Sequence, residues 1–182
     1  MAVGYEGKLV RLVASCKERH LENALRWIND PEITETLLIG DFPISRSSEE
    51  KWFDSVNTGQ SDVHFAIETL DGTHIGFSGI HGIDFRNGTA TTGSFIGEKQ
   101  WWGRGFGTDA ANVRSRYCFH VLGLRILYSA YIAGNVASAR MQQKAGYREY
   151  GIKPRASWKR GEFRDEVLTY LDRETWLGER QF

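Results

Sequence analysis

Apolar residues recur at every third or fourth position over residues 17–28, and this helical spacing is the first clear pattern along the chain. It predicts a helix that ends at Asn29-Asp30-Pro31, because proline disfavours a helical conformation in the residue before it. A partly alternating stretch at residues 8–13 predicts a strand ahead of this helix. Ser15 is the expected N-cap between the two.

Two more helical segments are expected before the pattern changes to strands. They are a helical turn over residues 32–38 and a helix that starts after Ser45 or Ser47. Two hairpin signals, Asp71-Gly72 and Asn87-Gly88, then separate stretches rich in β-branched and aromatic residues, which predicts an antiparallel meander. Its three strands are expected over residues 63–70, 74–83 and 90–97.

A glycine-rich segment, WWGRGFG at residues 101–107, joins the third of these strands to the next helix. Thr108 and Asp109 are expected at the N-terminus of that helix, and Gly123 is expected to end it. Three- and four-residue spacing gives the helix an apolar stripe of Ala110, Val113, Tyr117 and Val121.

The C-terminal third predicts one more strand, one more helix and a final strand pair. Asn135 opens the helix and Ala145-Gly146 ends it. The strands are expected over residues 125–132, 147–153 and 166–171, with a basic connection at 154–161 between the last two. An antiparallel start followed by alternating strands and helices implies a mixed α/β sheet with helices on both faces.

The glycine-rich segment suggests a binding role. Backbone N–H groups at a helix start lack intrahelical partners and lie at the positive end of the helix dipole, so they bind phosphate oxygens well. A tight turn that needs glycine only for its φ freedom is the alternative interpretation. The segment has neither the G-x-x-x-x-G-K-[ST] pattern of a nucleoside-triphosphate loop nor the glycine spacing of the dinucleotide fingerprint.

Residues 102–107 resemble the pyrophosphate loop, [QR]-x-x-G-x-[GA], of the GNAT superfamily of acetyl-CoA-dependent N-acetyltransferases. Trp102 replaces the usual Gln or Arg, as in the W-G-[KR]-G-[YF]-[GA]-T variant of the branch that includes the RimJ/RimL-like ribosomal-protein N-terminal acetyltransferases and many small-amine acetyltransferases. A second motif of this branch, N-x-x-S followed by K-x-G-[FY], corresponds to residues 135–138 and 144–147. The resemblance extends from Lys8 to Trp176.

This resemblance implies a fold in which the last strand of the meander and the next strand of the chain run parallel and then splay apart. The pantetheine arm of acetyl-CoA would enter the gap and pair with the first of them, as an added strand. Asn135 would also bond pantetheine, unless it serves only as a helix cap. The implied cofactor-binding residues are Phe95, Ile96, Gly97, Trp102, Gly103, Arg104, Gly105, Phe106, Gly107, Thr108, Asn135 and Ser138.

Acyl transfer to an amine needs a proton acceptor and a group that stabilises the departing thiolate. The usual family residues are absent, since Thr91 stands in place of the Glu base and Gln142 in place of the Tyr acid. Ser138 corresponds to a serine near the sulfur in the branch that lacks this Tyr. Of the five histidines, His81 is the candidate base because it lies on the strand beside the expected pantetheine strand; a structural or exposed histidine is the alternative.

Composition excludes several other classes. Lys plus Arg equals Asp plus Glu at 23 each, so no overall field attracts nucleic acid or an anionic membrane. Two cysteines, Cys16 and Cys118, predict free thiols and a cytoplasmic protein, and no signal peptide, membrane span or metal-ligand spacing is recognised. With 182 residues, the chain is expected to form a single domain over residues 1–182.

Together these observations predict an N-acetyltransferase that transfers an acetyl group from acetyl-CoA to a primary amine. The acceptor is either a protein N-terminus or a small molecule, and the protein is expected to be a monomer or a homodimer. By the resemblance, residues 33–46 line the acceptor site, and the basic residues of 153–161 raise the further option of an acidic acceptor. The alternative is a module that binds acetyl-CoA as a signal and has lost turnover, because both usual catalytic residues are missing.

Overall fold

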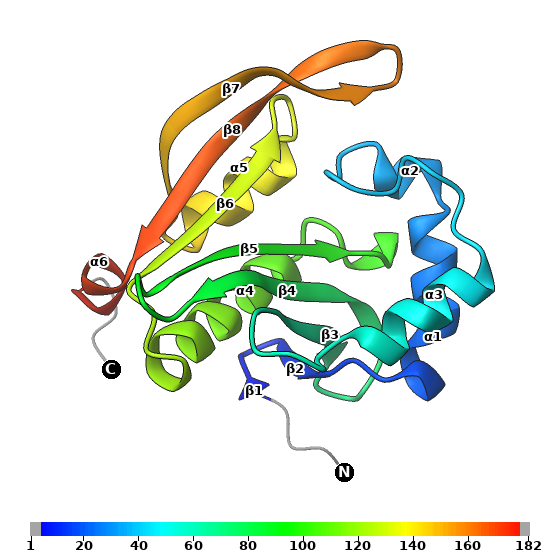
Figure 1. The fold of residues 1–182 in the computed structure, drawn as a ribbon, viewed down its shortest axis with the longest axis horizontal. Coiled ribbons are helices and arrows are strands. Elements are labelled where there is room, and N and C mark those ends of the chain that lie inside the picture. The colour runs from blue at the N-terminus through cyan, green and yellow to red at the C-terminus, as the bar shows by residue number, and fades with distance from the viewer. Residues whose placement is uncertain (1–4, 179–182) are drawn as a thin grey trace.

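The computed structural model describes residues 5–178, which form one eight-stranded sheet with helices on both faces (Figure 1). The strands lie in the order β1-β2-β3-β4-β5-β6-β8-β7. Their bounds are β1 Tyr5–Glu6, β2 Val10–Ala14, β3 Val63–Thr69, β4 His74–Asp84, β5 Thr89–Ile96, β6 Ile126–Ile132, β7 Arg148–Lys159 and β8 Glu162–Asp172. The helices are α1 Lys17–Ile28, α2 Pro31–Thr34, α3 Arg46–Ser55, α4 Phe106–Arg116, α5 Val136–Lys144 and α6 Arg173–Gly178, with a 3₁₀ turn η1 at Lys99–Trp101 and a π-helical segment η2 at Tyr117–Val121.

Strand pairing confirms the expected mixed sheet. Strands β1 to β5 pair antiparallel in succession, as do β6, β8 and β7, and the two groups meet where β5 and β6 run parallel. That parallel contact covers three residues of β5, from Thr89 opposite Ile126 to Thr91 opposite Tyr128. Beyond it the two strands diverge, and α5 lies beside the gap in Figure 1.

Side-chain hydroxyls take the place of the strand ladder at the point of divergence. The Thr92 hydroxyl donates to the Tyr128 carbonyl at 3.1 Å, and the Ser129 hydroxyl donates to the Thr92 carbonyl at 2.9 Å. Tyr147 bonds the same Thr92 hydroxyl at 2.8 Å, and the buried Arg114 of α4 donates to the Tyr147 oxygen at 3.3 Å. These hydrogen bonds replace part of the strand ladder where β5 leaves β6, while Ser94 Oγ on β5 and Arg114 Nε stay buried without a hydrogen-bond partner among the described residues.

Two helical layers cover opposite faces of the first strand group. The main core lies between the sheet and α4, and includes Ile80, Ala90 and Ala110. A smaller cluster lies on the other face, where α1 and α3 pack against Phe77. Since side chains alternate along a strand, Ala90 and Thr92 point toward α4 while Thr91, Gly93 and Phe95 point away from it. We call that second face of β4 and β5 the front face.

The N-terminal half agrees closely with the pattern-based expectation. Helix α1 has the predicted bounds, and Ser45 caps α3 by accepting the Ser48 N–H at 3.2 Å. The prediction for Ser15 was wrong, because Cys16 holds the N-cap position of α1 and the Ser15 hydroxyl donates to the His64 carbonyl at 3.4 Å instead. The predicted turn over residues 32–38 is also shorter, since α2 ends at Thr34.

Helix α4 departs from its predicted register at both ends. It starts at Phe106, two residues before the predicted Thr108, with Gly105 as its N-cap. Its predicted stripe fails at Val121, which is 56% exposed. The segment Tyr117–Val121 is π-helical, and its wider turn rotates the last residue off the buried face. Cys118 is a buried free thiol, as expected, and burial raises its pKa to about 12.

The largest correction concerns the final strand pair. The basic stretch at residues 154–161 is mostly strand, because β7 and β8 form one long hairpin that turns at Arg160-Gly161. Both turn residues have positive φ, 52° and 86°, as a two-residue type I′ turn requires. Pro154 is tolerated since β7 is an edge strand. Within residues 5–178, no helix is both long and apolar enough to cross a membrane.

Candidate active site

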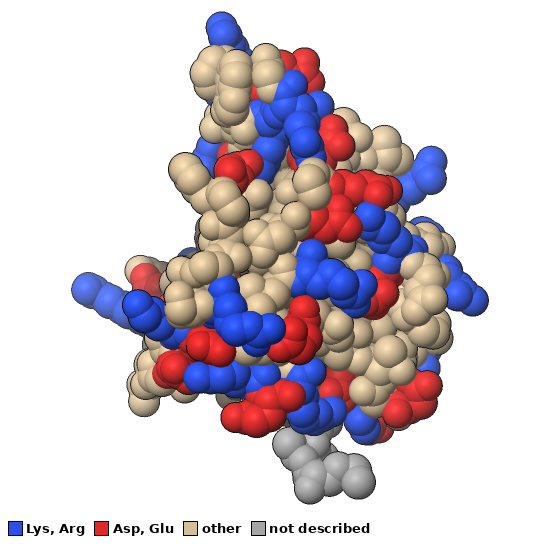
Figure 2. Space-filling view, turned by 90° about the vertical axis from the view of Figure 1, so that its right-hand side faces the viewer, with Lys and Arg blue, Asp and Glu red and all other residues tan. Residues whose placement is uncertain are grey.

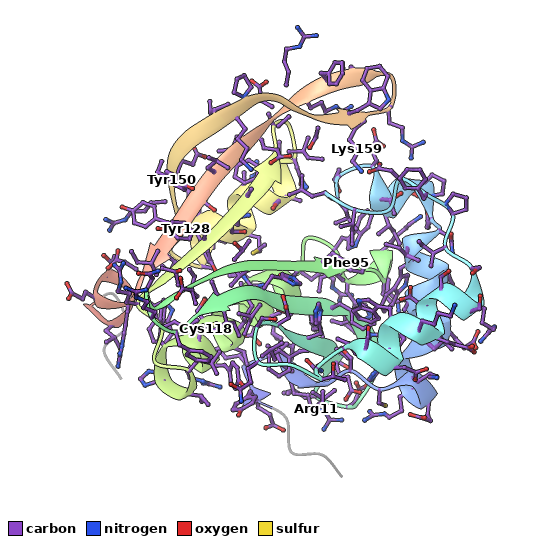
Figure 3. All side chains as sticks on the ribbon, viewed as in Figure 1. Arg11, Phe95, Cys118, Tyr128, Tyr150 and Lys159 are labelled. Atoms are coloured by element: carbon purple, nitrogen blue, oxygen red, sulfur yellow. The ribbon has the colours of Figure 1, made fainter. Side chains whose placement is uncertain are left out.

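The divergence of β5 from β6 leaves one edge of β5 without a neighbouring strand. The Gly97 N–H donates to the Ile75 carbonyl of β4 at 2.8 Å, so the main-chain groups of the preceding residue, Ile96, face the opposite edge. There the Ile96 carbonyl accepts the Trp102 indole N–H at 2.6 Å. Figure 3 shows Tyr128 where β6 is still paired with β5, and Phe95 farther along β5, where that pairing has ended. An extended ligand can add to such an edge through its own amides.

Helix α4 begins beside this edge with unused backbone donors. Its first backbone bond runs from Asp109 N to Gly105 O at 3.0 Å, and the N–H groups of Phe106, Gly107 and Thr108 come before it. The N-cap glycine offers no side-chain acceptor to them. The Asp109 carboxylate turns away from the helix end to bind the backbone of β2. The helix start is therefore suited to phosphate oxygens.

The glycines of this loop have different roles. Gly103 and Gly105 adopt φ of 71° and 91°, which only glycine adopts readily. At Gly107 a Cβ would meet Ile96 Cγ1 at 3.8 Å and Met141 Cγ at 3.6 Å, which are ordinary contacts. No protein atom thus excludes a side chain at Gly107. Its contacts show that the loop, the end of β5 and helix α5 converge at one point.

Asn135 and Ser138 lie at the start of helix α5, Ser138 about one turn before the Met141 that reaches Gly107. The Asn135 side chain caps the helix by accepting the Ser138 N–H at 3.0 Å, as the cap interpretation expected, and its amide donates to the Thr36 carbonyl at 3.3 Å. The half-buried Ser138 hydroxyl accepts from the Gln142 amide at 3.4 Å. Gln142, the residue in place of the usual Tyr, is only 4% exposed. It is too enclosed to reach a substrate itself.

His81 lies on the front face, above a floor of two glycines. A Cβ at Gly79 would lie 2.3 Å from His81 Nε2, so the imidazole lies back along β4 over Gly79. A Cβ at Gly93, the cross-strand partner of Gly79, would meet no atom within 4 Å. The front face is therefore open beside the imidazole. Thr91, opposite His81 on β5, is exposed and supplies no carboxylate.

Sequence reasoning missed the partner of His81. Asp62, in the loop before β3, has Oδ1 at 3.4 Å from His81 Nδ1. Hydrogen bonds from Ser61 and from the Gly82 N–H, followed by the two nearby imidazoles, hold the pKa of Asp62 below its usual range. The His64 ring packs edge-on against His81 with centroids 4.9 Å apart, and burial and the charge of His81 lower the pKa of His64. His81 thus has a carboxylate on Nδ1, while Nε2 faces the open floor.

The remaining histidines have structural surroundings. His20 and His74 are buried with ring centroids 4.5 Å apart, and burial lowers the pKa of His74 to about 3. His20 bonds the buried Glu68 at 3.2 Å, and burial lowers its pKa as well. His120 lies on η2 and stacks on Trp176. Of His20, His64, His74 and His81, only His81 combines a side chain that is 45% exposed with a carboxylate oxygen within 4 Å, among the described residues.

The two segments expected to bind the acceptor contact each other. Lys159, near the end of β7, is 5% exposed and places its ammonium on the Thr34 and Ile39 carbonyls and on the Asp41 carboxylate at 2.5 Å. Figure 3 shows Lys159 reaching from the hairpin toward α2. Lys153 pairs with Glu166 at 3.6 Å. Two of the four basic residues are therefore neutralised by acids, and the face in Figure 2 mixes both signs of charge.

Comparison with known protein families identifies the family of this chain. The sequence model of an acetyltransferase (GNAT) domain matches residues 10–148, and the chain therefore belongs to the GNAT acetyltransferase family. No curated protein matches the sequence significantly.

Solved structures agree on the fold. Spermidine N-acetyltransferase from Vibrio cholerae, in complex with CoA and spermine, has a TM-score of 0.85 at 19% identity, covering 92% of this chain and 98% of that one. Mycobacterium smegmatis RimJ in complex with CoA-disulfide has a TM-score of 0.81 at 19% identity, covering 91% and 82%. RimL, a ribosomal L7/L12 α-N-protein acetyltransferase in complex with coenzyme A, has a TM-score of 0.83 at 14% identity, covering 94% and 98%. The expected superfamily and fold are confirmed, and ribosomal-protein acetyltransferases are among the neighbours.

Proposed function

We propose that this protein transfers the acetyl group of acetyl-CoA directly to a primary amine, with both substrates bound at once. The observation that carries this proposal is the open edge of β5 next to the uncapped start of α4. Amides of a pantetheine arm would bond the main chain at Ile96, and the pyrophosphate would lie on the N–H groups of residues 106–108. Both proposed contacts use main-chain groups, and the unpaired edge of β5 and the N–H groups before Asp109 support them.

Bound acetyl-CoA supplies an activated thioester carbonyl at the gap. The amine nitrogen forms a bond to the carbonyl carbon, the carbon–sulfur bond breaks, and the proton released by nitrogen goes to His81 Nε2 in this proposal. Asp62 Oδ1 lies 3.4 Å from the other ring nitrogen, Nδ1, and in this proposal a proton on Nδ1 faces Asp62 and leaves the lone pair of Nε2 free. The Ser138 hydroxyl donates to the sulfur as negative charge develops there.

The acceptor would enter from the front face, between β5 and the segments at 33–46 and 153–161. Lys159 joins those two segments, which supports their action as one wall. Relatives accept quite different amines, because one neighbour binds spermine and another is an acetyltransferase of a ribosomal protein N-terminus. A small amine and a protein N-terminus both remain acceptors within this proposal. Ion pairing of Lys153 and Lys159 disfavours an anionic acceptor.

We also interpret residues 1–182 as a single acetyltransferase domain, which the continuous sheet of the described residues supports. The free Cys16 and Cys118 support the proposal of a cytoplasmic protein, and a monomer and a homodimer both stay within the proposal.

A second candidate is an acetyl-CoA sensor without turnover. Thr91 in place of a carboxylate and the enclosed Gln142 in place of a tyrosine favour it. It predicts CoA binding without product, whereas the His81–Asp62 pair favours an enzyme.

A panel of acceptors separates the two functions. Free thiol release from acetyl-CoA would be followed with spermidine, an amino sugar and a peptide with a free N-terminus, and acetylated product would be identified by mass spectrometry. We expect amine-dependent thiol release with at least one acceptor. Tight CoA binding with no release across the panel would overturn the enzyme assignment and support the sensor.

A further inference from the structure

The buried amide of Gln142 connects the last strand to the Ser138 hydroxyl. Gln142 Oε1 accepts the Thr169 hydroxyl of β8 at 2.5 Å. Its Nε2 lies 3.4 Å from both the Ala130 carbonyl of β6 and Ser138 Oγ, and donates to both. Gln142 and Thr169 are 4% and 1% exposed, so water does not compete for these bonds. Three elements thus fix the orientation of one amide.

These partners also determine which end of the amide faces Ser138. The Ala130 carbonyl can only accept, so the nitrogen of Gln142 must lie on that side and the oxygen must face the Thr169 hydroxyl. Ser138 Oγ therefore receives a hydrogen bond from Gln142. Since that contact leaves the Ser138 proton unused, the hydroxyl must donate to something else. The other contact of this residue, Asn135 Oδ1, is taken by the backbone N–H of Ser138.

We propose that Gln142 is a positioning residue that makes Ser138 an obligate hydrogen-bond donor toward the departing thiolate. This inference rests on the proposed role of Ser138 in acetyl transfer. A hydroxyl that accepts one hydrogen bond becomes a stronger donor in its own, because successive hydrogen bonds polarise one another. Gln142 thereby does indirectly what a tyrosine at the same position does in relatives, without touching the substrate.

Reversing the polarity of this one contact gives the sharpest test. In Gln142→Glu the side chain keeps its size, but an oxygen replaces the amide nitrogen. Burial favours the protonated acid, whose proton bonds the Ala130 carbonyl, and in either protonation state that oxygen can accept the Ser138 proton and turn it inward. We expect kcat to fall by about tenfold or more, as for loss of the serine donor itself, with acetyl-CoA affinity within about twofold. Gln143→Glu, on the exposed next residue, is the matched control and should retain wild-type kcat.

A double-mutant cycle separates positioning from general damage. If Gln142 acts through Ser138, adding Gln142→Glu to Ser138→Ala should lower kcat by less than about twofold further. A Gln142→Glu enzyme with wild-type kcat, or an undiminished Gln142→Glu effect in the Ser138→Ala background, would overturn the proposal. Circular dichroism and the melting temperature of each variant show whether the fold is retained.

A second measurement keeps the proposal testable without turnover. The thiol of bound CoA is titrated by the ultraviolet absorbance of its thiolate, in the wild type and in Gln142→Glu. A donor aimed at sulfur lowers the pKa of that thiol, so the variant should raise it relative to the wild type. Equal titration curves would overturn the positioning role, whereas a shifted curve in a protein that acetylates no amine would remove the proposed function and leave the Gln142 assignment standing.

Discussion

The two sides of the candidate active site use different chemical groups, backbone on the cofactor side and side chains on the acceptor side. On the cofactor side, the contacts proposed for CoA use the backbone of β5 and the start of α4, and the glycines at 103 and 105 supply a loop conformation. On the acceptor side, the proposed chemistry depends on side chains that come from distant parts of the sequence, such as Asp62 with His81. If both proposals hold, a substitution on the cofactor side acts by changing the backbone, whereas one on the acceptor side acts by removing a single functional group.

The largest effect is expected on the acceptor side, from His81→Ala. Loss of a general base costs on the order of 10²-fold in kcat/KM, measured with the best acceptor of the panel. The groups that face the imidazole, Asp62 and His64, stay in place in this variant. His120→Ala serves as the control histidine. An unchanged kcat/KM in His81→Ala would leave water as the proton acceptor.

On the cofactor side, Gly105→Val should weaken CoA binding by about tenfold or more. A residue with a side chain is strained at φ of 91°, so the loop backbone would change conformation. The N–H groups at the start of α4 would then no longer point toward the pyrophosphate. Gly123→Val is the matched control, since Gly123 has φ of 69° at the other end of the helix. We expect both variants to lose stability and only Gly105→Val to lose CoA affinity by calorimetry. Equal affinities in two folded variants would contradict the loop assignment.

Ser138→Ala should reduce kcat by about tenfold, an intermediate effect. The hydroxyl would act mainly in the transition state, so acetyl-CoA affinity should change little. Steady-state kinetics with the best acceptor of the panel, together with calorimetry for CoA, measure both quantities. Full activity in this variant would exclude Ser138 from the mechanism.

The smallest effect is expected from separating the two segments proposed to bind the acceptor, residues 33–46 and 153–161. Lys159→Met removes the buried ammonium that joins the hairpin to residues 34–41, and the KM of the acceptor should rise severalfold while CoA affinity stays within about twofold. Lys153→Met, which removes an exposed cation on the same strand, should leave both values near those of the wild type. A large loss of CoA binding in Lys159→Met would show that the two sides are not independent.

This contrast also explains what the sequence could predict. The order of strands and helices, the bounds of α1 and the glycine-rich loop follow from local periodicity and turn residues, and the family motifs cover the same segments. Asp62 could not be paired with His81 from spacing, because the contact depends on how β3 and β4 pair. The buried state of Lys159 depends on the contact of the hairpin tip with α2 and the loop after it, where Asp41 is 118 residues away in the sequence. The π-helical segment η2 after α4, which exposes Val121, could not be predicted from apolar residues at three- and four-residue spacing.

Backbone amide hydrogen exchange with and without CoA measures whether main-chain groups hold the cofactor. We expect slower exchange on adding CoA for peptides that cover the end of β5 and the start of α4, residues 94–108. We expect no change at the distal end of the hairpin, residues 155–163. Protection at the hairpin with none at residues 94–108 would show that the backbone of β5 and α4 does not bind CoA.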